Sequence, residues 1–252
     1  PVICVVLTID QQDVARTDWA IAQEGRLVYD AVSGGGPTPL DYSVGDGRFF
    51  SEANGRGGGD TGYTVTDAAG VPFWSEFLRR GGAPSVGYPA SDRIAWHGLT
   101  YQVMQKEVFP WQPQAHAVAY ANVFDAMHDA GFDTWLDTQR QIPPPLDTSA
   151  DAGLTWTQVI ARHEALLDRD PAIRARYTSD ASAIDDYGLP MAVKDYGPVV
   201  VARCQRGAFQ HWKVGVPWAA AGSVTVVNGG DLAKEAGLFP ADSLTPGLPN
   251  AN

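Results

Sequence analysis

The sequence has 252 residues and carries 29 acidic against 18 basic side chains, which gives a formal net charge of −11. A surface this acidic repels phosphate backbones and anionic lipids, and no Lys/Arg cluster offsets it, so we expect no nucleic-acid partner. The 44% hydrophobic content is enough for a substantial core. Because no run approaches about 18 apolar residues, we expect no membrane insertion. The N-terminus lacks the charged and apolar segments of a signal peptide, which is typical of a soluble or already processed chain.

The N-terminal part predicts a strand, a helix and then mostly turns. Residues 2–7 are apolar or Cys and predict a short buried strand, and residues 8–23 have helical apolar spacing. Glycine runs break regular structure, so residues 30–62 should form turns and short strands around Arg48. Neither run is followed by the Gly-Lys-Ser/Thr of a phosphate loop, and we interpret these glycines as structural.

The middle of the chain predicts a short helix, strands and a longer helix. Residues 72–80 begin with Pro and stop at a Gly pair, which indicates a short amphipathic helix. Residues 93–111 resemble strands, and residues 118–140 have helical spacing that ends before Pro143-Pro144-Pro145. This stiff triple proline predicts a boundary between an N-terminal part, 1–142, and a C-terminal part, 146–252.

Beyond the triple proline the same kinds of element return. The expected helices are 156–168, 171–177 and 231–236, and the expected strands lie in 199–212 and 224–227.

Two segments of the sequence correspond to each other about 100 residues apart. Residues 72–112 and 171–212 each contain a helix after Pro, then a Gly-x-Pro turn (Gly87-Tyr88-Pro89 and Gly188-Leu189-Pro190), then strand residues. The match predicts one supersecondary unit used twice. The fold class expected is therefore α+β, with repeated helix plus β-hairpin units and short antiparallel sheets. A third copy is present only as a fragment around Gly47–Phe50.

The first copy resembles the LGFP repeat. The resemblance lies in Gly87–Asp92 and Tyr101–Pro113, which carry a Gly-aromatic-Pro turn, a Tyr-Gln pair and a closing Trp. Glu107 departs from the repeat, which usually has Gly there, whereas the second copy has Gly207 but places its Trp one residue later. The resemblance implies a secreted or cell-surface protein that binds the bacterial envelope. The whole chain is also similar to uncharacterised extracellular LGFP-like proteins of thermophilic bacteria.

Cys4 and Cys204 are the only two cysteines, and each lies in an apolar run. They are either two buried strand thiols or one long-range disulfide, which would indicate an oxidising compartment. In both cases we expect their strands to be neighbours in one sheet.

The sequence carries no recognisable metal site or serine triad. Its five histidines show no ligand spacing, and neither a GxSxG segment nor a CxxC pair occurs. We interpret His128 and His163 as members of solvated helix faces, and we expect no metal and no cofactor.

Paired carboxylates leave open a second function, because a glycoside hydrolase needs only two suitably placed acids. The candidates are Asp185-Asp186, Glu76 and Glu52 near Asp60, and Asp133 and Asp137 share one helix face. Each of these acids also has an ordinary use on a loop or a solvated helix face.

Aromatic residues supply the candidate binding site. Tyr88, Trp96, Tyr101 and Trp111 cluster around the first hairpin, and such rings either close the core of the repeat or stack on sugars. We assign Tyr88, Trp96 and Tyr101 to binding, expecting Trp96 at an exposed hairpin tip and Trp111 buried. The sequence thus predicts a non-catalytic protein that binds a cell-envelope glycan or a surface protein, and the alternative is a carboxylate-dependent glycan hydrolase.

Overall fold

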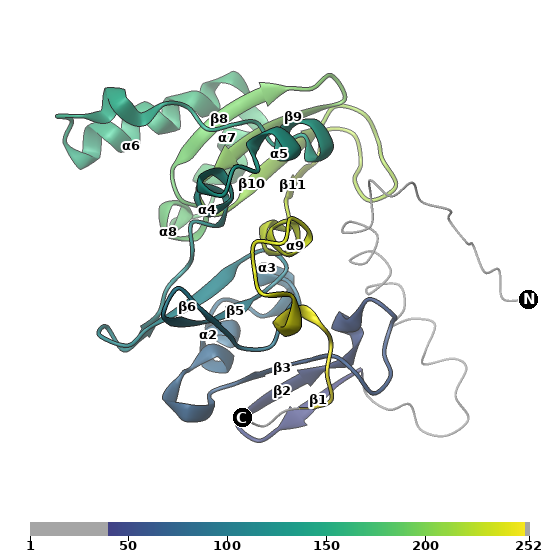
Figure 1. Cartoon of the computed structure of the whole chain (residues 1–252). Helices are drawn as coiled ribbons and strands as arrows, with labels where there is room; N and C mark the ends of the chain where they lie inside the picture. Colours follow the sequence, from purple (N-terminus) through teal and green to yellow (C-terminus); the bar gives the residue numbers. More distant parts are fainter. Residues whose placement is uncertain (1–39, 250–252) are drawn as a thin grey trace, which may run out of the picture.

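The computed structural model describes residues 40–249, which form a mixed α+β fold with three short antiparallel sheets (Figure 1). This confirms the predicted fold class. The predicted strand 2–7, the helix 8–23 and Cys4 lie outside the described residues. Cys204 is fully buried in its strand, and its pairing with Cys4 stays a prediction.

The first sheet is a three-stranded meander. It has the strand order β1-β2-β3, with β1 at Asp41–Val44, β2 at Gly47–Phe50 and β3 at Tyr63–Thr66. A 3-10 turn, η1 (Ser51–Asn54), and a glycine-rich loop join the last two strands, and η2 (Ala68–Gly70) follows them. Short strands were expected around Arg48, and β2 contains that residue.

The first repeat unit consists of two short helices and a four-stranded meander. The sheet order is β4-β5-β6-β7. Its elements are α2 (Phe73–Arg79), α3 (Ala83–Val86), β4 (Ile94–Trp96), β5 (Leu99–Val103), β6 (Val108–Gln112) and β7 (Ala117–Val118).

The second repeat unit has the same connectivity. Two short helices again precede a four-stranded antiparallel meander, here in the order β8-β9-β10-β11. Its elements are α7 (Pro171–Thr178), α8 (Ala183–Tyr187), β8 (Pro190–Asp195), β9 (Val199–Cys204), β10 (Ala208–Trp212) and β11 (Val224–Val226). The predicted two-copy repeat is therefore confirmed.

The two units also match in the contacts of their Gly-x-Pro turns. Gly87 and Gly188 have φ of 81° and 75°, a region that favours glycine. In the first unit the Tyr88 backbone N–H donates to Gln105 Oε1 over 3.0 Å. In the second unit the Leu189 N–H donates to Gln205 Oε1 over the same 3.0 Å. In both copies a glutamine side chain from the turn between two strands thus holds the Gly-x-Pro turn.

The remaining helices link the units or follow them. The single helix expected over 118–140 is instead β7 and two helices separated at Gly131, whose φ is 83°. The helix expected over 156–168 ends as an α-helix at Glu164 and continues as a 3-10 segment. The elements are α4 (Val123–Asp129), α5 (Asp133–Arg140), η3 (Thr148–Asp151), α6 (Trp156–Glu164), η4 (Ala165–Arg169), α9 (Gly229–Glu235) and η5 (Ala241–Leu244).

The helix that follows each unit packs on the other unit. Helix α4 comes after the first unit, yet the Phe124 N–H donates to the Gln205 carbonyl of the second unit over 3.0 Å. Helix α9 comes after the second unit, and the Gly230 N–H donates to the Gln105 carbonyl of the first unit over 2.9 Å. In Figure 1, α4 accordingly lies with β8–β11, and the yellow α9 lies between the two parts of the molecule. The two units are joined by this reciprocal exchange.

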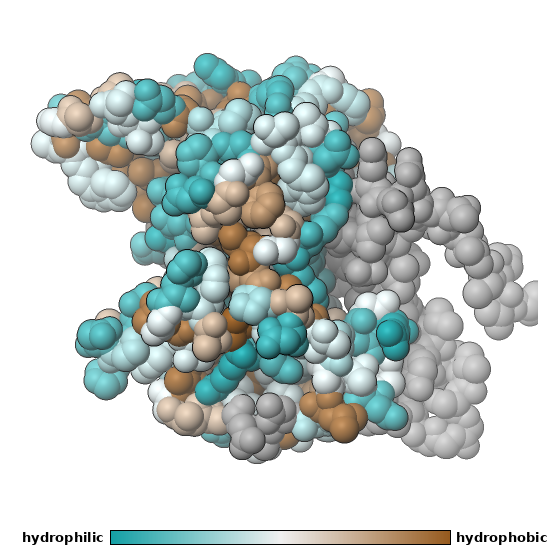
Figure 2. All heavy atoms as spheres, in the orientation of Figure 1, coloured by the Kyte–Doolittle hydropathy of each residue, from teal (hydrophilic) through white to brown (hydrophobic). Residues whose placement is uncertain are grey.

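Three hydrophobic clusters follow from this arrangement. In each unit one face of the sheet packs against that unit's own helices, Phe73 and Phe77 from α2 in the first and Ile173 and Tyr177 from α7 in the second. The other faces of both sheets meet in one shared cluster together with α4 and α9. Figure 2 shows apolar residues gathered between the upper and lower parts of the molecule. The shared cluster includes Ile94, Val103, Val108, Phe124, Met127, Val199, Val201, Ala208, Trp212, Leu232 and Ala233.

The triple proline runs along the second sheet. The fully buried Arg203 of β9 donates to the Pro143 carbonyl over 3.1 Å and to Asp133 over 2.8 Å. The Leu146 N–H donates to the Met191 carbonyl of β8 over 2.9 Å. Residues on both sides of the triple proline therefore contact the second unit.

No helix between residues 40 and 249 is long and apolar enough to cross a membrane.

Candidate functional site

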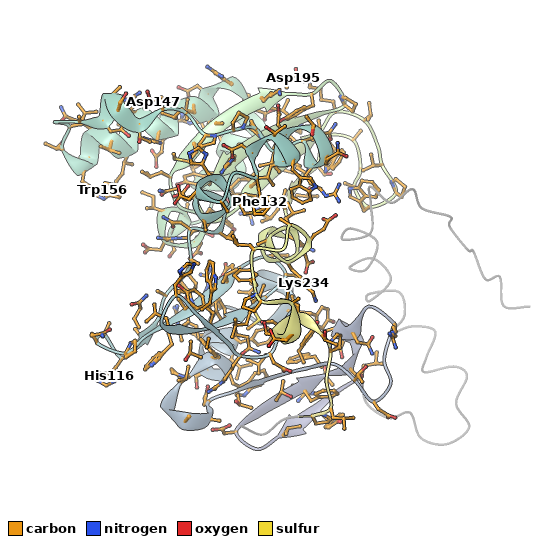
Figure 3. All side chains as sticks on the ribbon, viewed as in Figure 1. His116, Phe132, Asp147, Trp156, Asp195 and Lys234 are labelled. Carbon is orange, nitrogen blue, oxygen red and sulfur yellow. The ribbon has the colours of Figure 1, made fainter. Side chains whose placement is uncertain are left out.

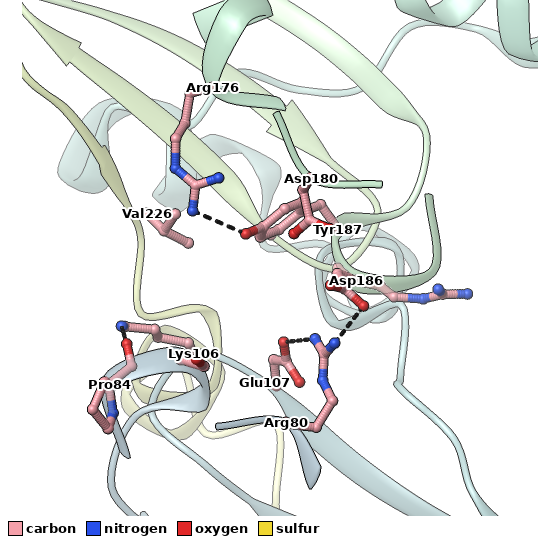
Figure 4. A pocket seen from close by; sticks show the side chains of 12 residues that line it. Arg80, Pro84, Lys106, Glu107, Arg176, Asp180, Asp186, Tyr187 and Val226 are labelled. Atoms are coloured by element: carbon pink, nitrogen blue, oxygen red, sulfur yellow. Dashed lines mark hydrogen bonds and ion pairs between the residues drawn. The ribbon is translucent and has the colours of Figure 1, made fainter. Parts of the chain in front are cut away.

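A polar pocket of about 340 Å³ lies where the two repeat units meet (Figure 4). The turn between β5 and β6 contributes Lys106 and Glu107, and the equivalent turn between β9 and β10 contributes Arg206 and Gly207. The helices of both units supply the rest of the wall. Those residues are Arg80, Pro84 and Ser85 from the first unit and Arg176, Asp180, Asp186 and Tyr187 from the second, with Val226 of β11.

Arg80 connects the two units across this pocket. One terminal nitrogen of its guanidinium donates to Glu107 Oε1, and the other donates to Asp186 Oδ1, each at a distance of 2.5 Å. The three side chains are only 13%, 9% and 11% exposed. Two glycines after α2, Gly81 and Gly82, turn the chain, with φ of 93° and 67°, and the residue before them, Arg80, reaches the second unit. A buried charge cluster of this kind is strongly destabilised when one partner is removed.

Glu107 holds a proton more tightly than an ordinary glutamate. Burial raises its pKa to about 7, although the bonds to Arg80 act in the opposite direction. Its second oxygen, Oε2, is buried and has no hydrogen-bond partner in the structure, which is rare for buried polar atoms. Burial also raises the pKa of Asp186. Near neutral pH the pocket therefore contains a carboxyl group that can donate or accept a hydrogen bond.

Two cationic groups face the pocket from opposite units. The Lys106 ammonium donates to the Pro84 carbonyl over 2.8 Å, and the Arg176 guanidinium donates to the Tyr187 hydroxyl over 3.2 Å. Neither lies within 4.0 Å of a carboxylate oxygen of any residue that the structure describes. The pocket thus offers hydrogen-bond donors from both units.

Arg206 has a different use. Its guanidinium donates to the carbonyls of Ile184 and Asp185 and to Asn122 Oδ1, which ties α8 to the start of α4. We therefore interpret Arg206 as a structural residue at the edge of the pocket.

The equivalent strand turns explain why the pocket is asymmetric. The Lys106 N–H donates to the Val86 carbonyl over 3.0 Å, and the Arg206 N–H donates to the Tyr187 carbonyl over 2.8 Å. These matched bonds place Glu107 and Gly207 at corresponding positions. A Cβ at Gly207 would come within 3.1 Å of the Tyr187 ring, so a side chain there would have to displace this ring slightly, whereas the first unit has a side chain at this position. That side chain is the carboxyl that bonds Arg80.

The three predicted binding aromatics lie outside this pocket. Tyr88 is half-buried, with its ring 6.1 Å from that of Phe50, and Tyr101 is only 9% exposed. Trp96 is at the hairpin tip as expected, but it is half-buried between the rings of Tyr101 and Phe239, at 5.1 and 5.0 Å. Tyr88 packs on a different hydrophobic cluster from the other two. Their role in binding stays a prediction, and they do not form one continuous platform.

The expected burial of Trp111 is wrong, because this side chain is only half-buried. Trp212 is the buried tryptophan, at 3% exposure, and its indole N–H donates to Thr225 of β11 over 3.0 Å. The one-residue shift between the repeats places the two rings on opposite faces of their sheets. Trp111 faces its own helices beside the two-residue strand β7, whereas Trp212 enters the shared core.

The prediction that His163 lies on a solvated helix face is also wrong. Its ring is 1% exposed and is held by the Pro190 carbonyl at 2.7 Å and by Asp151 at 2.9 Å. The helix α6 lies against β8 and buries this face. His128 is half exposed and bonds Asp133.

Of the predicted acids, only Asp186 lies in the pocket. Glu76 bonds Arg79 and Tyr120 on the first unit. Asp133 pairs with Arg203 and Asp137 pairs with Lys194, so these two do not converge on one cation. Among residues 40–249, no group of three or more His, Cys, Asp or Glu side chains is placed to hold a metal ion.

Comparisons with protein-family models, with curated proteins and with solved structures gave no match. The resemblance to the LGFP repeat therefore stays a prediction from the residues that carry it.

Most of the pocket residues escaped sequence reasoning. Arg80 and Arg176 belong to no motif, Lys106 stands out only as part of the repeat, and the three come together where the two units meet. One signal was present. Glu107 occupies the place where the second copy has Gly207, and a charged residue at a turn position that otherwise holds glycine indicates a local function.

Proposed function

We propose that this protein is a non-catalytic cell-envelope protein, secreted or held at the cell surface, that binds glycan in the pocket between its two repeat units. The observation that carries the proposal is the pocket itself, which is lined by donors and acceptors from both units. Its volume of about 340 Å³ falls within the range of roughly 300 to 1,000 Å³ typical of small-molecule sites. The location at the envelope rests on the resemblance to LGFP repeats.

The mixture of polar groups in the pocket suits a sugar. Each sugar hydroxyl both donates and accepts hydrogen bonds, and the wall supplies donors in Lys106 and Arg176 and an acceptor in the Asp180 carboxylate. Tyr187 adds an aromatic ring to the same wall. The predicted hairpin aromatics are less suitable, since their faces pack against other rings.

The test is retention of the purified chain on insoluble envelope glycans, followed by analysis of the soluble products. Ser85→Trp places a large ring at the pocket wall from an exposed position and should abolish retention. Ser149→Trp, an exposed serine of η3 outside the pocket, is the matched control and should be retained like the unmodified protein. Loss of retention on Trp96→Ala, with Ser85→Trp unaffected, would move the site to the hairpin and overturn the pocket proposal.

A glycoside hydrolase is the second candidate, favoured by one observation. Glu107 has its pKa raised to about 7 by burial, as a general acid requires at neutral pH, and Asp186 supplies a second carboxyl in the same pocket. Against it, Arg80 binds both acids. Release of soluble sugars that disappears in Glu107→Gln, while retention persists, would establish the hydrolase instead.

A further inference from the structure

The charges around the inter-unit pocket are not matched in pairs. The acids Glu107 and Asp186 share one cation, Arg80. Lys106 and Arg176 come from opposite units, and among the residues that the structure describes they bond a carbonyl and a phenol hydroxyl. Figure 4 shows these two side chains on the part of the wall away from the Arg80 cluster. One side of the pocket is therefore a carboxylate–arginine cluster and the other is cationic.

The two cations are close enough to affect each other. Burial lowers the pKa of Lys106, and the charge of Arg176 lowers it further, while Glu107 acts in the opposite direction. Like charges that share one cavity repel, and an anion between them removes that repulsion.

Arg176 is also held in position for a ligand. Its guanidinium lies over the rings of Tyr187 and Phe209, at 5.8 and 5.9 Å from their centroids. An arginine stacked in this way keeps its planar donors available for a carboxylate or phosphate.

The three acidic side chains of the pocket repel a bound anion less strongly than three free carboxylates would. Glu107 is about half protonated near pH 7 because burial raises its pKa to about 7, so it carries less negative charge than an ordinary glutamate. Asp186 is paired with Arg80. Asp180 accepts the N–H of Ser182 over 2.9 Å and is bonded to Asp186. Asp180 is thus the carboxylate, on the same side as Arg176, that repels a bound anion and limits the affinity of the pocket for it.

We propose that this pocket binds an oxyanion, the carboxylate or phosphate of an acidic glycan, between Lys106 Nζ and the Arg176 guanidinium. The inference rests on the proposed function and names its ligand class as acidic rather than neutral envelope polymers. A local cationic site also explains how a chain with a net charge of −11 could retain an acidic polymer, because the attraction acts at short range.

The experiment is an NMR titration of the full chain at low ionic strength with three probes, glucuronate, inorganic phosphate and glucose. The variants are Lys106→Gln and Arg176→Gln. Arg174→Gln is the matched control, since it lies on the same helix α7, is exposed and pairs with Asp168. Arg176→Lys keeps the charge, and the melting temperature of every variant shows whether it is folded.

We expect glucuronate or phosphate to bind more tightly than glucose, and the relative affinity of these two anions distinguishes a carboxylate from a phosphate ligand. Lys106→Gln and Arg176→Gln should each weaken anion binding about tenfold or more, the usual effect of losing a charged hydrogen bond. Arg174→Gln should change nothing, and Arg176→Lys should recover part of the affinity.

Equal affinity for glucose and glucuronate, or anion binding unchanged by both glutamine variants, would overturn the inference. The proposed glycan binding would stand if the chain were still retained on envelope glycans in that case. Conversely, anion binding that depends on Lys106 and Arg176, without retention on any envelope glycan, would support the anion site and remove the proposed function.

Discussion

Among the residues that the structure describes, Arg80 is the side chain that joins the charged groups of the two repeat units. It comes from the end of α2, and it bonds Glu107 of its own unit and Asp186 of the other. Because all three side chains are largely buried, water cannot replace the arginine when it is lost. Its neighbour Arg79 is 64% exposed, and among the described residues it bonds Glu76 and Tyr120. Glu76 is only 11% exposed, but it also accepts a hydrogen bond from the Tyr120 hydroxyl. Loss of the exposed Arg79 therefore leaves Glu76 with a partner, whereas Arg80 is the shared cation of two buried acids.

Arg80→Met should lower the free energy of unfolding at pH 7 by about 3 to 5 kcal/mol, since it leaves the buried pair of Glu107 and Asp186 without their shared cation. Arg79→Met should cost clearly less, because Arg79 is exposed and Glu76 keeps the hydrogen bond from Tyr120. Urea denaturation of both variants checks this. Equal effects of the two substitutions would contradict the buried cluster.

Glu107 makes stability depend on pH in a defined direction. Burial raises its folded-state pKa from the model-compound value of 4.5 to about 7. Between these values the folded protein binds a proton that the unfolded chain does not, so stability falls as pH rises. From pH 4.5 to pH 8 this single group should remove about 3 kcal/mol, and the raised pKa of Asp186 acts in the same direction.

Denaturation of the unmodified protein and of Glu107→Gln across this pH range measures the contribution. The difference between the two proteins should change by about 3 kcal/mol from pH 4.5 to pH 8, with the glutamine variant less sensitive to pH. Parallel curves for the two proteins would mean that Glu107 has an ordinary pKa.

At the scale of elements, the Gly-x-Pro turn is the feature on which each repeat unit depends. Gly87 and Gly188 both have positive φ, and a Cβ at either would come within 2.6 or 2.7 Å of Gln105 or Gln205. Those glutamines hold the turn through their side-chain oxygens. The same residue type thus meets two requirements, a left-handed backbone and close approach of a neighbour.

Gly87→Ala and Gly188→Ala should therefore each destabilise the protein by more than the same substitution at a glycine that meets only one of these two requirements. Gly98→Ala is the control, because Gly98 has φ of 76° but nothing within 4 Å of a Cβ. It should cost about 1 to 2 kcal/mol for the backbone alone. Thermal melts that show Gly98→Ala as damaging as the other two would contradict the shared turn geometry.

The sequence was most informative where local rules decide the structure. The helix over 72–80, the strands expected in 93–111, 199–212 and 224–227, and the twofold use of one motif follow from Pro and Gly positions and from apolar spacing, and the structure has these elements. The strands β7 and β8 were not predicted. The break at Gly131 was not predicted although its signal is local, since Gly131 has φ of 83° and the Phe132 N–H donates to the Met127 carbonyl at the end of α4. The burial of His163 did not follow, because it depends on how α6 packs against the second sheet. Tertiary contacts override local propensity at such positions.

At the scale of the whole molecule, the exchange of helices determines where the pocket lies. Helix α4 bonds Gln205 and α9 bonds Gln105, so the two strand turns face each other. Lys234 on α9 reinforces the exchange, since it bonds the Tyr63 hydroxyl and the Ala90 carbonyl of the lower part (Figure 3). No local pattern in the sequence predicts this crossing, because it joins residues about 100 positions apart. For that reason the sequence predicts a binding site at the hairpin aromatics, which lie close together in the sequence, and does not predict the pocket.

The large apolar side chains that remain exposed among residues 40–249 are Leu78, Leu154, Trp156, Val214 and Leu248. Trp156 at the tip of the projecting helix α6 is 60% exposed, and Figure 3 places it far from Lys234. Single exposed apolar residues are ordinary on protein surfaces, so the pocket remains the strongest candidate site.

The most direct test of the pocket as the binding site is to map backbone amide chemical shifts while a soluble, acidic envelope glycan fragment is added. We predict shifts concentrated at residues 104–107 and 204–207 and in α8, the segments that surround the pocket, and none at the β4–β5 hairpin. Shifts centred on Trp96 and Tyr101, with the two strand turns unchanged, would contradict the inter-unit site and return the binding function to the hairpin aromatics.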